Sequence, residues 1–382
     1  MRGLPGRDDR PLYAVPRPHL RHGVSGRASA GPRRPHHGRP LLYALWQQVP
    51  GARVVAGCRL LRGGLSHGLP EGRVKVVVLG VGRVKVAVVG AGSIGRRHID
   101  TLLSLGQDVV VVDPADPPLP NAVARRPRLA DLRDCRAALI CTPASERLPI
   151  IDELIDMGID LFIEKPLALD LGQAKAIAEL VATYPRRVVM MGYNLRFDPD
   201  LFRAVLRIRG MGRIAHARFL CSSYLPQWRA GRDYRDTPSA KASLGGGILR
   251  EASHELDLVN WIFQPLLRNA EIAATLERRS ELEIDVEDTA HIRVRIPNGP
   301  AIDLDLDFCT PGYRRSLTVV GDGPTIEWHL LNDSPMYRKE MEHFLWCVEN
   351  RIQPRVGITD GLLAMALDHR IRTVAGSTWV AA

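Results

Sequence analysis

Two short stretches of the chain carry lysine, histidine and acidic residues with the spacing of an acid–base site. Lys165 directly follows a strand-like apolar run and precedes a proline. A lysine at the end of a buried strand is partly desolvated, which lowers the pKa of its ammonium group towards values useful for proton transfer. His254 and Asp257 share one face if residues 251–263 form a helix. The pattern predicts proton transfer, and the alternatives are a solvated lysine and a histidine with purely structural contacts.

A glycine-rich turn between a predicted strand and a predicted helix has the form of a nucleotide-binding loop. Residues 84–89 (VKVAVV) have the pattern of a buried strand, and the sequence Gly90-x-Gly92-x-x-Gly95 follows them. In such a loop Gly90 makes the tight turn, Gly92 lets the backbone approach a pyrophosphate, and Gly95 lets the helix pack closely on the strand. The helix that follows ends near Gly106, and its N-terminus attracts the anion.

A near-copy of this strand and turn comes just before it. Residues 73–82 end in Gly80-Val81-Gly82, but Lys85 stands where the third glycine is required. A second strand follows this copy instead of a helix. The loop at 90–95 is therefore the predicted phosphate loop.

The next predicted strand ends in Asp113, which lies 21 residues beyond Gly92. A carboxylate at this place accepts hydrogen bonds from the adenosine ribose and repels a 2′-phosphate, so NAD(H) is favoured over NADP(H). The alternative is that Asp113 only ends the strand. A methyltransferase would show a similar loop and acid, so this half of the chain leaves the chemistry open.

Strand-like and helical stretches alternate up to about residue 196, which predicts an α/β fold with a parallel sheet. Thr142-Pro143 and Glu164-Lys165 follow two of the strands, and ligands bind at the carboxyl ends of such strands. Further along, apolar and polar residues alternate with period two, which predicts half-buried strands of a second sheet. These stretches are 288–296, 301–308 and 314–321, and late helices are expected at 334–348 and 358–376.

Charge divides the chain into two parts. The net charge of the 382 residues is +10, but residues 1–82 carry a net +11 and the remaining 300 residues a net −1. The body therefore has no excess positive charge for a nucleic-acid partner. No apolar run approaches the about 18–20 residues that a membrane helix needs. The six cysteines form no C-x-x-C pair and no zinc pattern, so we expect reduced thiols, no metal and a cytoplasmic location.

Residues 1–82 are rich in arginine, proline and glycine and lack a periodic apolar pattern. This composition predicts disorder or a spurious extension of the coding sequence, because the segment cannot bury enough apolar surface. Its apolar stretch at 41–49 lies too far from the start for a secretory signal. The arginine bias suits a transit peptide, but the proline content does not.

The segment LPQWRAGRDYRD (225–236) is too polar for a core and too aromatic for a plain linker. Trp228 and Tyr234 suit contacts with sugar rings, and the arginines suit phosphate. The alternatives are a solvated loop or a subunit contact. The arginines are Arg229, Arg232 and Arg235.

Five motifs together resemble the Gfo/Idh/MocA oxidoreductases, a family that includes glucose–fructose oxidoreductase and inositol dehydrogenases. The resemblance implies a Rossmann domain at 83–196, followed at 197–382 by an α/β domain with a large, open, mostly antiparallel sheet that binds substrate and joins subunits. The motifs are VKVAVVGAGSIGRRH (84–98), CTP (141–143), EKP (164–166), GYNLRF (192–197) and GGGILREASHELD (245–257).

The resemblance also implies roles for single residues. Lys165 matches the lysine of the EKP motif and His254 the histidine of the H-x-x-D segment, with Asp257 as a partner that orients His254 or balances its charge. Implied cofactor contacts are Gly90, Gly92, Ser93, Ile94, Gly95, Asp113, Thr142, Pro143, Glu164, Lys165, Asn194 and Arg196. Implied substrate contacts are Trp228, Arg232, Tyr234, Arg235 and Arg250.

Two positions depart from the family pattern. Inositol dehydrogenases carry an aspartate four residues before the histidine, where this chain has Arg250, and Glu251 stands three residues before it. Either Glu251 replaces the aspartate as a catalytic residue, through a one-residue deletion, or Arg250 binds an anionic substrate. Arg147 stands where relatives often have a histidine after the TP motif.

The activity that the resemblance implies is hydride transfer between nicotinamide and a hydroxyl carbon of a sugar, nucleotide sugar or cyclic polyol. NAD(H) is the favoured cofactor and NADP(H) the alternative. A homodimer or homotetramer formed through the open sheet is expected. The competing function is a non-enzymatic, dinucleotide-binding sensor of the same fold, and the presence of Lys165 together with His254 favours an enzyme.

Overall fold

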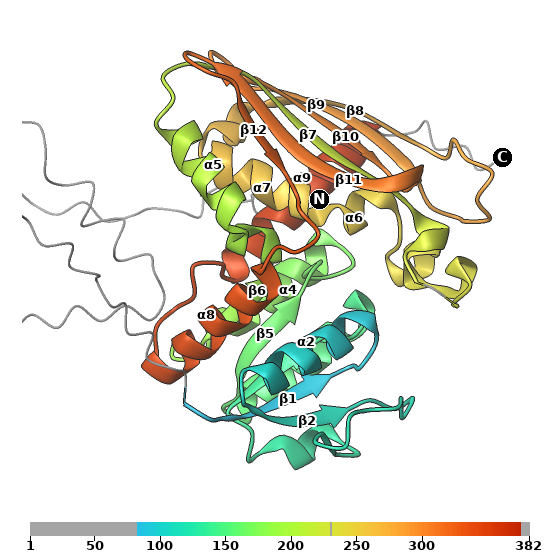
Figure 1. The fold of residues 1–382 in the computed structure, drawn as a ribbon, viewed down its shortest axis with the longest axis vertical. Coiled ribbons are helices and arrows are strands. Elements are labelled where there is room, and N and C mark those ends of the chain that lie inside the picture. Colours follow the sequence, from blue (N-terminus) through green and yellow to red (C-terminus); the bar gives the residue numbers. More distant parts are fainter. Residues whose placement is uncertain (1–81, 230, 376–382) are drawn as a thin grey trace, which may run out of the picture. The chain divides into compact units, whose positions relative to one another are not determined.

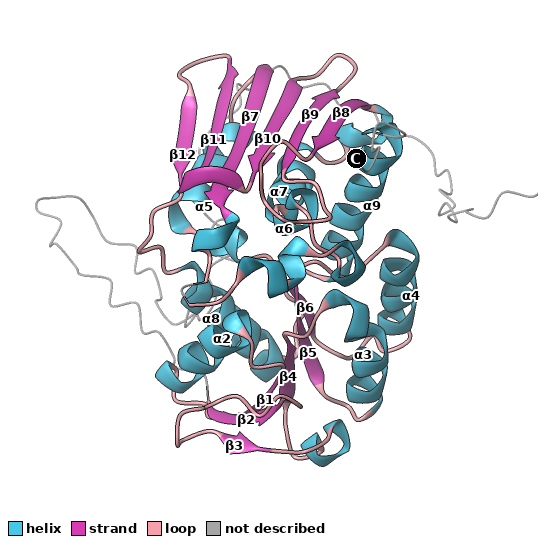
Figure 2. Cartoon of the chain, turned by 90° about the vertical axis from the view of Figure 1, so that its right-hand side faces the viewer, coloured by secondary structure: helices cyan, strands magenta, loops and turns pink. Residues whose placement is uncertain are grey.

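The computed structural model describes residues 82–229 and 231–375, so the predictions for residues 1–81 lie outside the described residues. The described chain forms two sheets, each with helices packed on it (Figures 1 and 2). No helix in this part of the chain is long and apolar enough to cross a membrane.

The first sheet is parallel throughout and has the strand order β3-β2-β1-β4-β5-β6. Its central strands are buried apolar runs, as a sheet covered by helices on both faces requires. The strands are β1 (Lys85–Val89), β2 (Asp108–Val112), β3 (Ala124–Arg125), β4 (Ala137–Ile140), β5 (Asp160–Glu164) and β6 (Val189–Gly192), and the helices between them are α2 (Ser93–Ser104), α3 (Arg147–Asp156) and α4 (Leu171–Ala182). The prediction of a Rossmann-type α/β sheet is confirmed.

The second sheet is mixed and mostly antiparallel, with the order β12-β11-β7-β10-β9-β8 and one parallel pair, β7 with β10. Alternate residues of β9 and β10 are buried, which confirms the half-buried strands that the period-two pattern predicts. The strands are β7 (Ile214–Tyr224), β8 (Glu271–Glu277), β9 (Thr289–Arg295), β10 (Ala301–Asp307), β11 (Cys309–Gly321) and β12 (Ile326–His329).

Helices cover one face of this second sheet (Figure 2). They are α5 (Pro199–Arg209), α6 (Ile248–Glu251), α7 (Ser253–Phe263) and α9 (Ile358–Ala375). The short 3-10 segments are η1 (Leu129–Leu132), η2 (Ala144–Glu146), η3 (Asn194–Phe197), η4 (Leu225–Gln227), η5 (Tyr234–Asp236), η6 (Pro238–Ala240), η7 (Ala242–Leu244) and η8 (Leu266–Asn269).

A late helix returns to the first sheet. Helix α8 (Met336–Asn350) follows the last strand of the second sheet, yet it packs against α2 (Figure 1). The guanidinium of Arg97 on α2 lies 4.6 Å from the ring centroid of Tyr337 on α8. Helix α9 in turn packs on both α4 and α7. The two sheets are therefore tied together by chain that comes after both of them.

Candidate active site

The loop between β1 and α2 has the backbone that the three glycines predict. Gly90 has a φ of +89°, a conformation that favours glycine, and its N–H donates to the carbonyl of Val112. A Cβ at position 95 would lie 2.0 Å from the carbonyl oxygen of Gly90, so only glycine allows helix and strand this close. A Cβ at Gly92 would meet no atom within 4 Å, because this residue faces open space.

The N-terminus of α2 is ready for an anion. Gly92 caps the helix without a side-chain hydrogen bond, and the first turn contains no acidic residue. The free N–H groups and the helix dipole both favour a negatively charged group at this place. Gly92, Ser93 and Ile94 line a hollow of about 400 Å³.

Asp113 follows β2 and lies beside the same loop. Its Oδ2 accepts a hydrogen bond from the N–H of Ala91 at 2.6 Å, and its Oδ1 accepts one from Ala115 at 2.8 Å. Each carboxylate oxygen keeps a free lone pair, so the group still has the capacity to accept ribose hydroxyls.

Most of the residues implied for cofactor contact line this first hollow. The side chains of Thr142 and Asn194 contribute buried oxygens, Oγ1 and Oδ1, that have no hydrogen-bond partner among the described residues. Unpartnered buried oxygens, an uncapped helix and the space at Gly92 fit a bound dinucleotide. The implied residues in the lining are Gly92, Ser93, Ile94, Thr142, Pro143, Glu164, Lys165 and Asn194.

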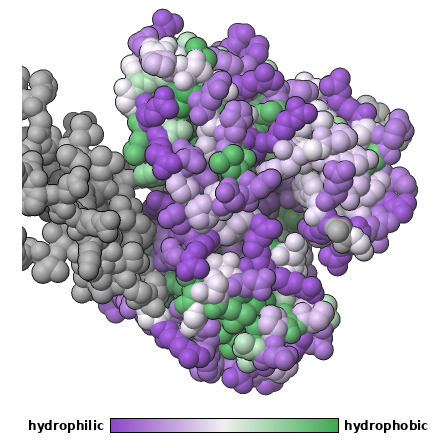
Figure 3. Space-filling view, viewed as in Figure 1, coloured by the Kyte–Doolittle hydropathy of each residue, from purple (hydrophilic) through white to green (hydrophobic). Residues whose placement is uncertain are grey.

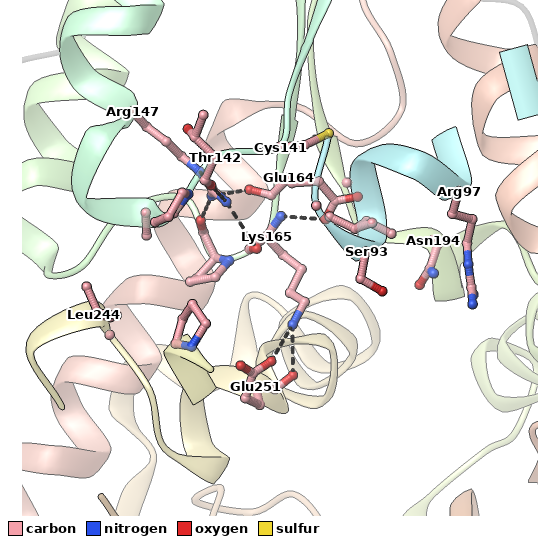
Figure 4. A pocket seen from close by; sticks show the side chains of 18 of the residues that line it. Ser93, Arg97, Cys141, Thr142, Arg147, Glu164, Lys165, Asn194, Leu244 and Glu251 are labelled. Atoms are coloured by element: carbon pink, nitrogen blue, oxygen red, sulfur yellow. Dashed lines mark hydrogen bonds and ion pairs between the residues drawn. The ribbon is translucent and has the colours of Figure 1, made fainter. Parts of the chain in front are cut away.

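Arg147 holds two strand-end turns together. Its guanidinium donates to the carbonyls of Thr142, at 2.9 and 3.2 Å, and of Lys165, at 3.4 Å. It also donates to the carbonyls of Glu164 and Pro166 (Figure 4). Burial lowers the pKa of Arg147 to about 10. Arg147, which departs from the family pattern, is therefore a structural residue that fixes the turn carrying Lys165.

The carboxyl group of Glu164 is buried and faces the hollow. Its Oε1 lies 2.7 Å from Nε2 of His98, and its Oε2 accepts the N–H of Lys165 at 3.0 Å. These bonds fix the direction in which the chain leaves β5.

Lys165 reaches from the end of β5 to α6, where it meets Glu251 (Figure 4). Its Nζ lies 3.0 Å from Oε2 of Glu251 and 3.2 Å from the carbonyl oxygen of the same residue. Ser239 donates to the other carboxylate oxygen, Oε1, at 2.6 Å. Burial alone would raise the pKa of Glu251, but the charge of Lys165 and the hydrogen bonds from Ser239 and Lys165 outweigh burial and lower it.

His254 lies in the first turn of α7 and lines the same hollow. Its side chain is 8% exposed, and its Nδ1 has no hydrogen-bond partner among the residues that the structure describes. Burial, with the positive charges of Arg315 and Lys165, holds the pKa of His254 well below its usual range. The imidazole is therefore neutral near pH 7.

Asp257 does not orient His254. Its carboxylate binds the guanidinium of Arg196, with 2.8 Å between Nε and Oδ2, and Arg196 also pairs with Asp360 at 2.9 Å. Burial raises the pKa of Asp257 to about 6 against the effect of Arg196. The prediction of a His254–Asp257 pair is corrected, and Arg196, implied as a cofactor contact, lies in this buried ion cluster instead of in the hollow's lining.

Arg250 points to a different part of the molecule. It lines a separate hollow of about 290 Å³, together with Glu287 and Arg372, and is absent from the lining that contains His254. The two alternatives for the departure from the family pattern were Glu251 as a catalytic residue and Arg250 as an anion-binding residue. In the structure Glu251 contacts Lys165, whereas Arg250 lies outside the lining of the site.

A second hollow, of about 590 Å³, lies against the second sheet. It is lined by residues of β7 and β11, such as Ser223 and Tyr313, and by Trp228. Lys165, Glu251 and His254 line both hollows, so they stand where the two meet. The other shared residues are Ser93, Arg97, Arg229 and Tyr337.

Some residues of the segment 225–236 line the hollows, and others lie on the surface. Trp228 lines the second hollow, Arg232 the first, and Arg229 both. Tyr234 and Arg235 line neither: the Tyr234 hydroxyl accepts the N–H of Glu283 at 3.1 Å, and Arg235 pairs with Asp233 and Glu283. The predicted substrate contacts of Tyr234 and Arg235 are thus not brought to the hollows.

Several lining residues were not predicted. Tyr337 comes from α8, far along the chain, and no local pattern marks it. Tyr313 and Arg315 alternate along β11 on the face that Leu317 buries, so the period-two pattern contained a signal for them. Ser239, which lines neither hollow but donates a hydrogen bond to Glu251, also had no signal in the sequence.

Comparisons with known proteins agree with this architecture. Residues 84–193 match the model of an oxidoreductase family with an NAD-binding Rossmann fold, GFO_IDH_MocA, and residues 202–327 match the GFO/IDH/MocA C-terminal domain. The chain belongs to this oxidoreductase family, whose first domain binds NAD.

Individual relatives are distant but cover most of the described chain. An inositol 2-dehydrogenase of Rhizobium meliloti is 25% identical over 270 residues, which is 63% of this chain and 79% of that protein. A levoglucosan dehydrogenase solved with NADH has a TM-score of 0.68 at 17% identity, covering 77% of this chain and 97% of that one. The WlbA dehydrogenase of Bordetella pertussis, solved with NADH and UDP-GlcNAcA, has a TM-score of 0.65 at 19% identity, covering 77% and 96%.

Proposed function

We propose that the protein is an NAD(H)-linked dehydrogenase that acts on a hydroxyl carbon of a sugar or cyclic polyol. The observation that supports this most directly is the meeting of Lys165, Glu251 and His254 at the point where two hollows join. One hollow contains the phosphate loop, and the other lies on the second sheet. A dinucleotide and a small substrate that fill them would react beside these three side chains. The names of the relatives support the substrate class.

The residues of the first hollow, together with Asp113 beside the phosphate loop, would hold the dinucleotide. Gly92, Ser93 and Ile94 present helix N–H groups to its pyrophosphate, Asp113 accepts its ribose hydroxyls, and Asn194 and Thr142 offer polar atoms to the nicotinamide half. When bound there, NAD⁺ supplies the acceptor for the hydride.

Lys165 and His254 would handle the proton of the substrate hydroxyl. The ammonium of Lys165, which pairs with Glu251 at 3.0 Å, donates a hydrogen bond to the hydroxyl oxygen. The neutral imidazole of His254 accepts the hydroxyl proton as the C–H bond breaks and the carbonyl forms. In the reverse direction both groups stabilise or protonate the oxygen as the hydride arrives at carbon.

The variant Lys165→Met tests this proposal, with Lys241→Met as the matched control. Lys241 is a half-buried lysine that pairs with Asp236 and lines neither hollow. Turnover of NAD⁺ should fall about 10²–10⁴-fold in Lys165→Met, because a positioned acid–base group contributes that much, while NADH affinity stays near that of the wild type.

The control variant separates the possible outcomes. Lys241→Met should keep full turnover. Undiminished turnover in Lys165→Met would sink the assignment of Lys165. NADH binding without turnover of any sugar in the wild type would favour the sensor function over the enzyme.

We include a homodimer or homotetramer formed through the second sheet in the proposal, because the described helices cover only one face of this sheet (Figure 2). Ion pairs cross the strands on the other face: Asp303 contacts His216 at 2.9 Å and Arg293 at 2.6 Å, and the neighbouring Asp305 makes corresponding contacts. Hydrophilic residues also predominate in the upper part of Figure 3, where Figure 1 places this sheet. Light scattering gives the mass in solution, and a monomer would contradict this part.

The described cysteines support a reducing compartment, and we include the cytoplasm in the proposal on this ground. Five cysteines in the described part of the chain are free thiols, and three of them are buried.

A further inference from the structure

Positive charge gathers around the joined hollows, and only part of it is neutralised. Among the cations that line them, Lys165 pairs with Glu251, and Arg315 pairs with Glu255 at 2.8 Å. Arg147 is buried among backbone carbonyls. These three cations are satisfied by the protein itself, so they have little capacity left for a ligand.

Three further guanidinium groups in the lining have no carboxylate partner within residues 82–229 and 231–375. They are Arg97 from α2 and Arg229 and Arg232 from the segment after β7. Arg97 lies over the ring of Tyr337, which fixes its direction. Arg229 is close enough to Glu251 to contribute to the lowering of its pKa.

The carboxylates nearest in sequence are already engaged elsewhere. Asp233 binds Arg235, which also contacts Glu283, and Asp236 lies 3.8 Å from Lys241. The same short segment therefore contains a fully paired arginine that faces away from the hollows and two unpaired arginines that face them. Unpaired positive charges around a concave surface make its electrostatic potential more positive, and this favours the binding of an anion.

Aromatic rings line the hollow beside these arginines. Trp228, which adjoins Arg229, is 36% exposed. Its ring packs edge-on against the ring of Phe308, with 6.0 Å between the two ring centroids. Tyr313 is 51% exposed in the same lining. Flat rings with a polar edge suit the face of a sugar, and guanidinium forks suit the paired oxygens of a carboxylate or phosphate.

We propose that the substrate is an anionic sugar, whose carboxylate or phosphate ester is bound by Arg229 and Arg232. The inference rests on the proposed function. Arg229 lines both hollows and Arg232 the first, so the oxyanion would lie where the hollows meet, with the sugar ring beside Lys165 and His254. Arg97 on α2 adds a further unpaired positive charge to the lining of both hollows. The chemistry shared by the candidates is an oxyanion attached to a pyranose, as in a uronate, a sugar phosphate or a nucleotide sugar.

The test is calorimetric binding at saturating NADH, using glucose, glucuronate, glucose 1-phosphate and UDP-glucose as probes. At least one anionic probe should bind ten or more times as tightly as glucose, with an affinity that falls as salt rises. Preference for glucuronate assigns a carboxylate, and preference for either of the other two anionic probes assigns a phosphate. Equal binding of glucose and all anionic probes, or binding of none of the anionic probes, overturns the inference.

Matched arginine variants locate the anion. The double variant Arg229→Gln/Arg232→Gln, measured at saturating NADH, should lose the preference for the anionic probe while its melting temperature stays unchanged. Arg235→Gln, the paired arginine of the same segment, should keep the preference. An unchanged preference in the double variant overturns the inference. Failure of the wild type to bind NADH would instead count against the proposed function, so the two failures are distinguishable.

Discussion

Glu251 contacts Lys165 through both its carboxylate and its backbone carbonyl, so its negative charge balances the positive charge of Lys165. The variant Glu251→Gln keeps the shape but removes the negative charge. We expect kcat to fall about 10–100-fold, because a charged hydrogen bond is worth about 1.5–3 kcal/mol. Steady-state kinetics with NADH affinity as a second readout measures the effect.

The control for this change is Glu283→Gln. Glu283 is exposed, pairs with Arg235 and lines neither hollow. This variant should retain the kcat of the wild type. Equal kcat values for both variants would show that the pairing of Lys165 with Glu251 has no part in turnover.

We expect Asp113 to favour NADH over NADPH. Asp113→Ser should weaken NADH binding about tenfold or more, since one charge-assisted hydrogen-bond acceptor is lost, and should narrow the preference for NADH over NADPH. Fluorescence titration with each cofactor gives both affinities. Asp116→Ser is the control, because Asp116 is exposed and pairs with Arg125. A wild-type ratio of the two affinities in Asp113→Ser would contradict the assignment.

At the scale of elements, two glycines of the loop between β1 and α2 are expected to have different roles, Gly95 in folding and Gly92 in cofactor binding. Gly95→Ala puts a Cβ 2.0 Å from the carbonyl oxygen of Gly90, so it should destabilise the fold by about 1–3 kcal/mol. Gly92→Ala meets no protein atom within 4 Å and has an ordinary φ of −67°, so stability should hold. The new methyl group would occupy the space of the pyrophosphate, and NADH affinity should fall.

Thermal melting and NADH titration of both variants check this pair of expectations. A stable Gly95→Ala protein would show that helix and strand are less closely packed than the structure describes. Unchanged NADH affinity in Gly92→Ala would place the dinucleotide elsewhere.

Helix α8 contains a buried carboxylic acid, Glu340, that should make the stability of the fold depend on pH. Glu340 is fully buried, and neither of its carboxyl oxygens has a hydrogen-bond partner among the described residues. Burial, with the nearby charge of Glu164, raises the pKa of Glu340 well above its usual range. A raised carboxyl pKa contributes stability that is fully present below the unfolded value and is lost as pH rises through the folded value.

The variant Glu340→Gln isolates this contribution. The melting temperature of the wild type should decline with pH above the ordinary carboxyl range, and Glu340→Gln should decline less steeply. Melting curves across pH for both proteins measure the difference. Parallel curves would contradict a buried, neutral Glu340.

The sequence predicted the positions of strand ends better than the directions of side chains. Lys165 and the loop at 90–95 were predictable because a buried strand followed by glycine or proline fixes where the chain emerges. The pairing of Asp257 with Arg196 was not predictable, because Arg196 comes from η3 and its burial depends on packing between distant parts of the chain. The shared face of His254 and Asp257 was conditional on a helix over residues 251–263. Helix α7 begins at Ser253, and the backbone breaks at Ala252, with φ −87° and ψ 26°, between α6 and α7. This break sets the directions of Arg250 and Glu251 independently of His254.

At the scale of the whole molecule, both sheets and the helices that link them lie within residues 82–375. Deleting residues 1–81 should therefore leave the melting temperature and NADH affinity unchanged, since the composition of that segment gives it little apolar surface to bury. Differential scanning calorimetry of the full and shortened chains compares them. A drop of several degrees in the shortened chain would show that the segment contributes to the fold.

The parallel sheet, the open second sheet and the late helices could all be predicted from periodicity and from the family resemblance. The return of α8 to α2 could not, because its contacts join Arg97 to Tyr337 across most of the chain and no local pattern encodes them. That return brings Tyr337 to the joined hollows, so the part of the site that was missed is the part that depends on tertiary packing.

The proposed site requires the loop at 90–95 to hold NAD(H) beside Lys165 and His254. Calorimetric titration of the full chain with NADH, and then with NADPH, measures this binding. We expect saturable binding of NADH with a raised melting temperature, because a ligand that binds only the folded state stabilises it, and weaker binding of NADPH. No heat of binding and no change in melting temperature with either cofactor would show that the loop at 90–95 does not bind a nicotinamide dinucleotide.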